Sequence, residues 1–130
     1  MTFDAIGIAG TALSTNRKWL DAISDNIANV NTARRTSEAA FQARYLQVEA
    51  GEGTSGVYVK ADLYGDAEGR LAYDPSNPLA DEEGMVRMPD IDLAEQMTSL
   101  IIAQRAYAAN AAVVDRARET YTAGLQIGRS

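Results

Sequence analysis

The chain has 130 residues, a net charge of −6, and neither cysteine nor histidine. This length fits one domain, or one helical module with an insertion. The acidic net charge argues against nucleic-acid binding. Without cysteine the chain has no disulfides and no thiolate chemistry, and without histidine it lacks the commonest general base and metal ligand.

No run of apolar residues is long enough to cross a bilayer. The first ten residues contain Asp4 and two glycines and have no basic segment, so they do not resemble a secretory signal. We therefore expect a cytoplasmic protein, or one that leaves the cytoplasm by a route that reads no cleavable signal.

Apolar residues near the N-terminus recur at alternating gaps of three and four, which predicts an amphipathic helix over about residues 3–31. The asparagine-rich run at 26–32 ends it, because asparagine tolerates left-handed backbone and bonds nearby peptide groups. The predicted stripe consists of Ile6, Ala9, Leu13, Asn16, Leu20, Ile23, Ile27 and Val30.

The middle of the chain changes from the helical period to alternation, which predicts short strands separated by turns rich in Gly, Pro and Asp. The expected strands are residues 41–48, 57–63, 70–73 and 85–88.

Three segments of this middle region have the residue types of a binding or catalytic site. The Gly51–Gly56 run has the spacing of a dinucleotide fingerprint, but a strand follows it instead of a helix, so we interpret it as a hairpin loop. Asp62, Asp66 and Glu68 lack EF-hand spacing, and residues 81–83 have no pocket-forming aromatics nearby. We interpret both sets as turn carboxylates and expect no catalytic, cofactor-binding or metal-binding residues.

The last helix is predicted to begin near Asp92, where Asp92 and Glu95 resemble a capping box, and to continue to about Gly124. Its heptad stripe consists of Leu93, Met97, Leu100, Gln104, Tyr107, Ala111, Val114, Arg118, Tyr121 and Leu125.

These elements predict a mainly α fold with a small β insertion, in which the two long terminal helices pack as an antiparallel coiled-coil-like pair. The expected segments are an N-terminal helix (1–32), a β-rich middle segment (33–91) and a C-terminal helix (92–130). With the chain ends side by side, Asn26 would lie near Ala106, at the level of residues 105–110 of the same subunit or of a neighbour. It would bond backbone or the side chains of Tyr107 or Asn110, because a polar residue among apolar ones fixes the register of the pair.

Two interpretations of the stripes remain open: a helical hairpin within one chain, or pairing with a neighbouring subunit. Apolar residues outside the stripes favour further helix partners; they are Ile8, Ile101, Ile102, Ala108, Ala109, Ala112 and Val113. The residues expected to act in helix pairing or assembly are Ile6, Leu13, Leu20, Ile23, Asn26, Ile27, Asn29, Val30, Met97, Leu100, Ile101, Gln104, Tyr107, Asn110, Val114 and Tyr121.

Three separate motifs carry a family resemblance. Residues 24–32 resemble the N-terminal asparagine-rich signature of the bacterial flagellar rod and hook proteins, and residues 104–114 resemble their C-terminal Ser-Arg-x-Tyr-x-x-Asn helix. Residues 73–89 are similar to the Pro- and Asp-containing segment of the proximal rod members. Asp25, Met85 and Asp90 depart from the family pattern, which affects only local contacts.

The resemblance implies a structural subunit of the flagellar basal-body rod, with no enzymatic activity and no cofactor. Its implied partners are other rod subunits, copies of itself and the flagellar type III export apparatus, with no nucleic acid and no small-molecule substrate. The implied location is the periplasmic rod, reached without a cleaved signal peptide. The alternatives are another axial subunit of the same family, a cytoplasmic helical adaptor or export chaperone and, more remotely, a small carboxylate-dependent hydrolase.

Overall fold

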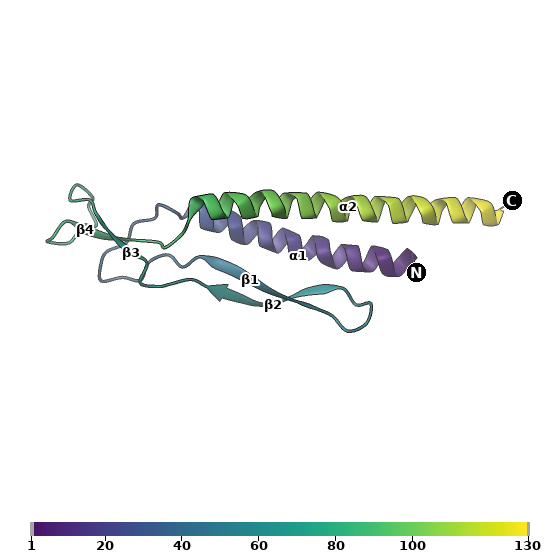
Figure 1. The fold of residues 1–130 in the computed structure, drawn as a ribbon, viewed down its shortest axis with the longest axis horizontal. Helices are drawn as coiled ribbons and strands as arrows, with labels where there is room; N and C mark the ends of the chain where they lie inside the picture. Colours follow the sequence, from purple (N-terminus) through teal and green to yellow (C-terminus); the bar gives the residue numbers. More distant parts are fainter. Residues whose placement is uncertain (1, 130) are drawn as a thin grey trace. The chain divides into compact units, whose positions relative to one another are not determined.

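The computed structural model describes residues 2–129, so Met1 and Ser130, which end the predicted terminal segments, lie outside the described residues. None of the described helices is long and apolar enough to cross a membrane. In chain order the elements are α1 (Thr2–Ala28), β1 (Arg44–Ala50), β2 (Val57–Tyr64), β3 (Arg70–Tyr73), β4 (Met85–Met88) and α2 (Leu93–Arg129), as Figure 1 shows.

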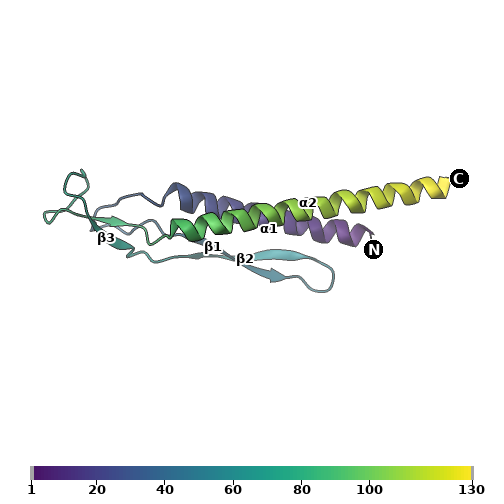
Figure 2. The same cartoon turned by 45° about the horizontal axis from the view of Figure 1, so that its top comes forward.

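The predicted fold class is confirmed: two long terminal helices pack together, and the middle of the chain forms two small two-stranded sheets. Figures 1 and 2 show α1 and α2 side by side in both views. The bounds predicted for β3 and β4 are those found.

Other boundaries differ from prediction, including the ends of β1 at Ala50 and of β2 at Tyr64. The first helix stops at Ala28, and the Asp25 carbonyl near its end accepts hydrogen bonds from both the backbone N–H and the side-chain amide of Asn29. The last helix passes Gly124 and ends at Arg129, because one interior glycine costs only about 1 kcal/mol. The first strand begins at Arg44, where the side chain of Asn26 engages its backbone.

The chain forms two compact units, each containing part of both helices. Unit 1 comprises Met1–Leu20, Leu46–Ala61 and Ile101–Ser130, and unit 2 comprises Asp21–Tyr45 and Asp62–Leu100.

In unit 1 the buried hydrophobic residues are small: Ala9 and Ala103. Strand β2 is attached to α1 by two threonine hydroxyls. The Thr11 hydroxyl accepts a hydrogen bond from the Val57 N–H at 3.0 Å, and the Thr15 hydroxyl donates to the Val57 carbonyl at 3.1 Å. Both peptide groups of Val57 are therefore satisfied by a helix instead of a neighbouring strand.

In unit 2, β3 and β4 pair antiparallel, with Leu71 opposite Arg87 and Tyr73 opposite Met85. Arg34 extends this sheet, since it exchanges backbone hydrogen bonds of 2.8 and 2.9 Å with Arg87. The buried hydrophobic side chains of this unit are Ala22, Ile23, Ala40, Ala43 and Val86.

The predicted cap of the last helix is confirmed in part. The Asp92 carboxylate accepts hydrogen bonds from the N–H groups of Ala94 and Glu95 at 2.9 and 3.3 Å. These are two of the donors that a helix start leaves without intrahelical partners, so Asp92 fixes where α2 begins.

Candidate functional site: a buried asparagine junction and exposed helix faces

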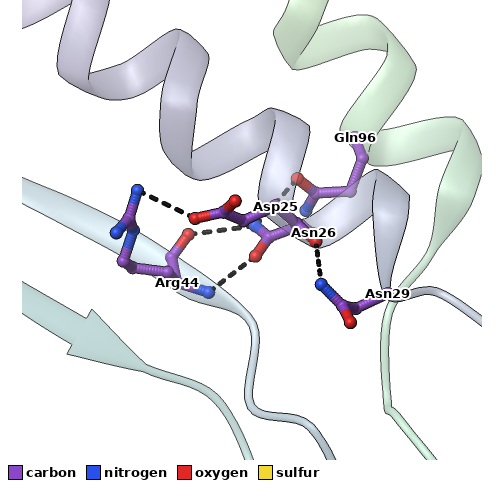
Figure 3. Close-up of polar contacts among 5 residues, drawn as sticks. All are labelled: Asp25, Asn26, Asn29, Arg44 and Gln96. Carbon is purple, nitrogen blue, oxygen red and sulfur yellow. Dashed lines mark hydrogen bonds and ion pairs between the residues drawn. The ribbon is translucent and has the colours of Figure 1, made fainter. Parts of the chain in front are cut away.

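Asn26 lies near the end of α1 and is only 1% exposed. Its side-chain amide donates to the Arg44 carbonyl at 3.0 Å, and its side-chain oxygen accepts from the Arg44 N–H at 2.8 Å (Figure 3). The carboxamide thus bonds both peptide groups of Arg44, as a neighbouring strand would. The same amide donates to the Gln96 side-chain oxygen at 3.1 Å.

Gln96, near the start of α2, is 3% exposed. Asn26 therefore links three elements of unit 2: the end of α1, the start of β1 and the start of α2. We call Asn26, Arg44 and Gln96 the asparagine junction. A buried polar group is costly unless its hydrogen bonds are made, so this junction specifies one arrangement of the three segments.

Asp25 and Asn29, which flank the junction in Figure 3, are less buried than Asn26 and Gln96. The Arg44 guanidinium is 3.2 Å from the Asp25 carboxylate, and both side chains are partly exposed, so this pair contributes little stability. Asn29 donates to the Asp25 carbonyl at 2.9 Å and accepts from the Thr32 hydroxyl at 3.0 Å. Asn29 thus ends α1, while Asn26 organises the unit.

Asn26 bonds backbone, as one of the predicted alternatives has it, but within this chain it does not bond the predicted segment of α2. Tyr107 and Asn110 were expected, but Asn26 bonds Arg44 and Gln96, and the Asn110 amide donates within its own helix to the Ala106 carbonyl. Gln96 lies ten residues before the expected position at Ala106. The prediction assumed that the chain ends are level, whereas α2 has 37 residues and α1 has 27.

The stripe predicted on α2 coincides only in part with the line of this helix that the chain buries. Gln96 and Ala103 are buried, and Leu100, Ala106, Asn110, Val114 and Ala117 are half-buried at helical spacing. The stripe was predicted from heptad spacing, whereas the buried line also includes the small residues Ala103, Ala106 and Ala117, which allow closer approach of a neighbouring segment. Five of the predicted assembly residues are instead exposed, namely Met97, Ile101, Gln104, Tyr107 and Tyr121.

On α1 the predicted stripe faces inward. Ile23 is buried, and the other apolar members of the predicted set are half-buried: Ile6, Leu13, Leu20, Ile27 and Val30. The two terminal helices therefore differ, because α1 covers most of its predicted stripe within the chain and α2 leaves much of its own in solvent.

The turn segments have structural roles. The Asp81 carboxylate accepts from the N–H groups of Glu83 and Met85 and from the Thr36 hydroxyl. These bonds, of which the one from Met85 has the largest effect, lower the pKa of Asp81, although burial opposes them.

The other two candidate segments are also turns. Asp66 accepts from the Glu68 N–H, and no metal-binding cluster of acidic residues is found within the described residues. The Gly51–Gly56 segment is the predicted hairpin loop, closed by a 2.7 Å bond from the Gly51 N–H to the Gly56 carbonyl.

The comparisons with known proteins point to flagellar rods. The family model described as "Flagella basal body rod protein" matches residues 6–34, and the one described as "Flagellar basal body rod FlgEFG protein C-terminal" matches residues 82–127. The chain is 33% identical to the flagellar basal-body rod protein FlgC of Salmonella typhimurium, with 94% of each chain covered. The chain belongs to the FlgC family.

Other FlgC proteins are similarly related to this FlgC-family chain. That of Yersinia enterocolitica is 35% identical over 94% of each chain, and that of Borreliella burgdorferi is 31% identical over 96%. The N-terminal family match includes Asn26, and the C-terminal one includes Gln96 and the exposed face of α2. The resemblance predicted from the sequence motifs is therefore confirmed.

Proposed function

We propose that this FlgC-family chain is a structural subunit of the flagellar basal-body rod that assembles through its terminal helices into the axial drive shaft. The observation that carries the proposal is the match to FlgC rod proteins over 94% of both chains. In this proposal residues 1–32 and 92–130 are the helices of the axial domain, and residues 33–91 form the middle segment.

The distribution of exposed apolar residues supports assembly through the helices. Ile101 and Tyr121 are 50% and 39% exposed on α2, although both are large hydrophobic residues. Every residue from 118 to 129 is exposed. A neighbouring helix that covered these side chains would gain the hydrophobic free energy that the single chain does not.

The partners in this proposal are other rod subunits, copies of the chain itself and, during export, the flagellar type III apparatus. The rod location follows from the relatives. We further propose that the rod subunit lies in the periplasm and is delivered there without cleavage of a signal peptide. N-terminal peptide mapping of the protein recovered from purified basal bodies tests this, because the first residues of the sequence should still be present. A shortened N-terminus, or a protein found only in the cytoplasm as for an export chaperone, would contradict it.

We also propose that the chain has no catalytic activity, no cofactor, no nucleic-acid partner and no small-molecule substrate. Two of the candidate carboxylates have structural roles, since Asp81 and Asp66 each accept hydrogen bonds from the backbone N–H groups of their own turns. The net charge of −6 disfavours contact with a phosphate backbone.

Assembly is tested by complementing a deletion strain. Ile101→Asp with Tyr121→Asp alters two exposed positions, so the subunit should fold and be exported, while rod incorporation and motility should be lost. Val48→Asp is the matched control, because Val48 is 50% exposed, as Ile101 is, but lies outside the terminal helices. Full motility with both helix substitutions would contradict assembly through α2.

A further inference from the structure

The β3–β4 sheet of unit 2 has one covered edge and one open edge. On the covered edge, Arg87 exchanges both of its peptide hydrogen bonds with Arg34, and the N–H and C=O of Met85 bond Asp81. Both residues of β4 therefore direct their peptide groups away from β3. Because hydrogen-bonded and non-hydrogen-bonded pairs alternate along an antiparallel ladder, only the intervening residues of β4 bond β3.

The open edge belongs to β3. Leu71 and Tyr73 lie opposite Arg87 and Met85, so their own peptide groups point out of the strand pair on the other side. Within the described residues these groups have no hydrogen-bond partner. The two side chains are also exposed, at 54% and 73%. This edge therefore combines free N–H and C=O groups with apolar side chains, which makes it a template for a further strand.

Opposite charges lie at the two ends of β3. Arg70 and Asp74 share the sheet face of Ala72, because side chains alternate along the strand and the Asp74 N–H continues the ladder to the Gly84 carbonyl. Arg70 is exposed, and in the described part of the chain neither charge is held in an ion pair. The Asp74 carboxylate accepts only from neutral side chains of its own turn. A strand that is basic at one end and acidic at the other is complementary to an antiparallel copy of itself.

We propose that two copies of the chain pair through this open edge, with β3 antiparallel to β3 of the second copy and the two Ala72 residues opposite each other. Leu71 then exchanges both peptide hydrogen bonds with Tyr73 of the second copy, and Tyr73 does so with Leu71 of that copy. Arg70 lies opposite Asp74 at both ends of the contact. The partner is thus a second copy of this chain, selected by charge and by main-chain hydrogen bonding.

Neighbouring registers are less favourable. Sliding one strand by two residues in one direction places Pro75 opposite Leu71, and proline has no N–H to donate. Sliding it in the other direction places Glu68 opposite Asp74, which brings like charges together. The register that pairs Arg70 with Asp74 avoids both faults.

The other charges of this sheet lie away from the contact. Arg87 and Arg34 are one and two strands away from β3, about 5 and 10 Å, and the Arg87 guanidinium donates to the carbonyls of Thr36 and Glu68. Leu71 and Tyr73 therefore meet the second copy's apolar side chains and not its cations. Unit 2 has five basic residues against thirteen acidic ones, a net charge of −8, which opposes the pairing at long range. Association is therefore measured at about 0.15 M salt, where charges more than about 8 Å apart are largely screened.

The proposed contact is two-fold symmetric, so it closes on itself. Arg34 already occupies the other edge of β4, so the paired sheet has no free edge at that position for a third copy. A rod propagates only through head-to-tail contacts, which places this dimer among subunits that are not yet assembled. The inference therefore goes beyond the proposed function and describes a state of the free chain.

The absence of cysteine makes the register testable by cross-linking. Ala72→Cys should form a disulfide-linked dimer on mild oxidation, because its Cα should lie about 4.5 Å from that of its counterpart, within the range of a disulfide. Leu71→Cys and Tyr73→Cys should each cross-link poorly alone, although both positions are more exposed, because neither lies opposite itself. Their mixture should form the mixed dimer. Equal cross-linking of Leu71→Cys and Ala72→Cys, or a mixture no faster than its components, would overturn the proposal.

Charge reversal tests the pairing without cysteine. R70D places two carboxylates opposite each other at both ends, and D74R places two guanidinium groups there. Each variant alone should dimerise about tenfold more weakly than the unchanged chain in sedimentation equilibrium. An equimolar mixture of the two should recover dimer, because both ends are then complementary, and misfolded variants could not recover it. Absence of that recovery would refute the contact.

The same measurement separates this inference from the proposed function. The variant with Ile101→Asp and Tyr121→Asp should dimerise as the unchanged chain does, because α2 takes no part in the β3 contact. Loss of the dimer in that variant would show that copies associate through α2, which would overturn the β3 contact and leave assembly through the terminal helices in place. An unchanged chain that stays monomeric up to millimolar concentration would likewise refute only the dimer, since rod assembly is tested by motility.

Discussion

The two compact units stabilise their conformations in different ways. Unit 2 buries a polar junction in which the Asn26 side chain makes three hydrogen bonds to two other segments. Among the residues whose burial is described, unit 1 buries only small hydrophobic ones. It attaches a hairpin through two threonine hydroxyls and leaves much of α2 exposed. The difference indicates that unit 2 is specified within the chain, while the helix surfaces of unit 1 remain available to partners.

The largest expected effect is the loss of the asparagine junction. Asn26→Ala would leave both peptide groups of Arg44 and the Gln96 side chain without their partner, and unfilled hydrogen bonds in buried sites are costly. We expect unit 2 to lose about 2–5 kcal/mol of unfolding free energy, measured by urea denaturation.

Asn29→Ala is the matched control for that substitution. The Asn29 side chain bonds the Asp25 carbonyl at an exposed helix end, so its loss should cost about 1 kcal/mol or less. Equal losses for Asn26→Ala and Asn29→Ala would show that the junction does not hold unit 2 together.

The next effect concerns the hairpin in unit 1. Gly56 has a φ of 98°, and a Cβ at this position would collide with the Thr11 hydroxyl that holds Val57. Gly56→Ala should therefore combine backbone strain with a broken attachment and cost about 2–4 kcal/mol. Unfolding can be followed by the fluorescence of Trp19, the only tryptophan, which lies in unit 1.

Gly53→Ala separates the two causes. Gly53 also has a positive φ, 61°, but nothing lies within 4 Å of an added Cβ, so only strain of about 1–2 kcal/mol is expected. If Gly53→Ala were as damaging as Gly56→Ala, the approach of the hairpin to Thr11 would not matter.

A smaller effect should follow from Thr11→Val. The substitution keeps the side-chain shape and removes the acceptor of the Val57 N–H, at a cost of about 1–2 kcal/mol. Thr120→Val is the control, because that exposed hydroxyl bonds only the Arg116 carbonyl of its own helix. Hydrogen exchange at Val57 should accelerate in the first variant and stay unchanged in the second.

The smallest effect is the pH dependence of the turn at Asp81. The hydrogen bond from Met85 is the main cause that holds the pKa of Asp81 below its ordinary value of 3.8. Its stabilising contribution is therefore complete above that ordinary value and is lost as the pH falls through the lower folded pKa. Asp81→Asn should remove this dependence, whereas Glu82→Gln should not.

The amide NMR signals of Glu83 and Met85 provide the measurement, because both N–H groups bond the Asp81 carboxylate. In the unchanged chain these signals should shift at a pH below 3.8. A midpoint at or above that value would contradict the role given to the turn.

The sequence by itself determined the local elements and the family. Alternation and turn residues located β3 and β4, and Asp92 marked the start of α2, because strand periodicity and helix capping depend on residues close in the chain. The asparagine-rich and C-terminal motifs indicated the flagellar rod family that the relatives confirm.

Only the tertiary structure decided which residues meet. Asn26 was predicted to bond near Tyr107 and Asn110, whereas its bonds to Arg44 and Gln96 join positions 18 and 70 residues away in the chain. Spacing within one helix gives its possible faces and not the face that a partner covers. On α2 the buried line passes through Gln96, which is held by its hydrogen bond to Asn26, and through Ala103, where a small residue allows close approach.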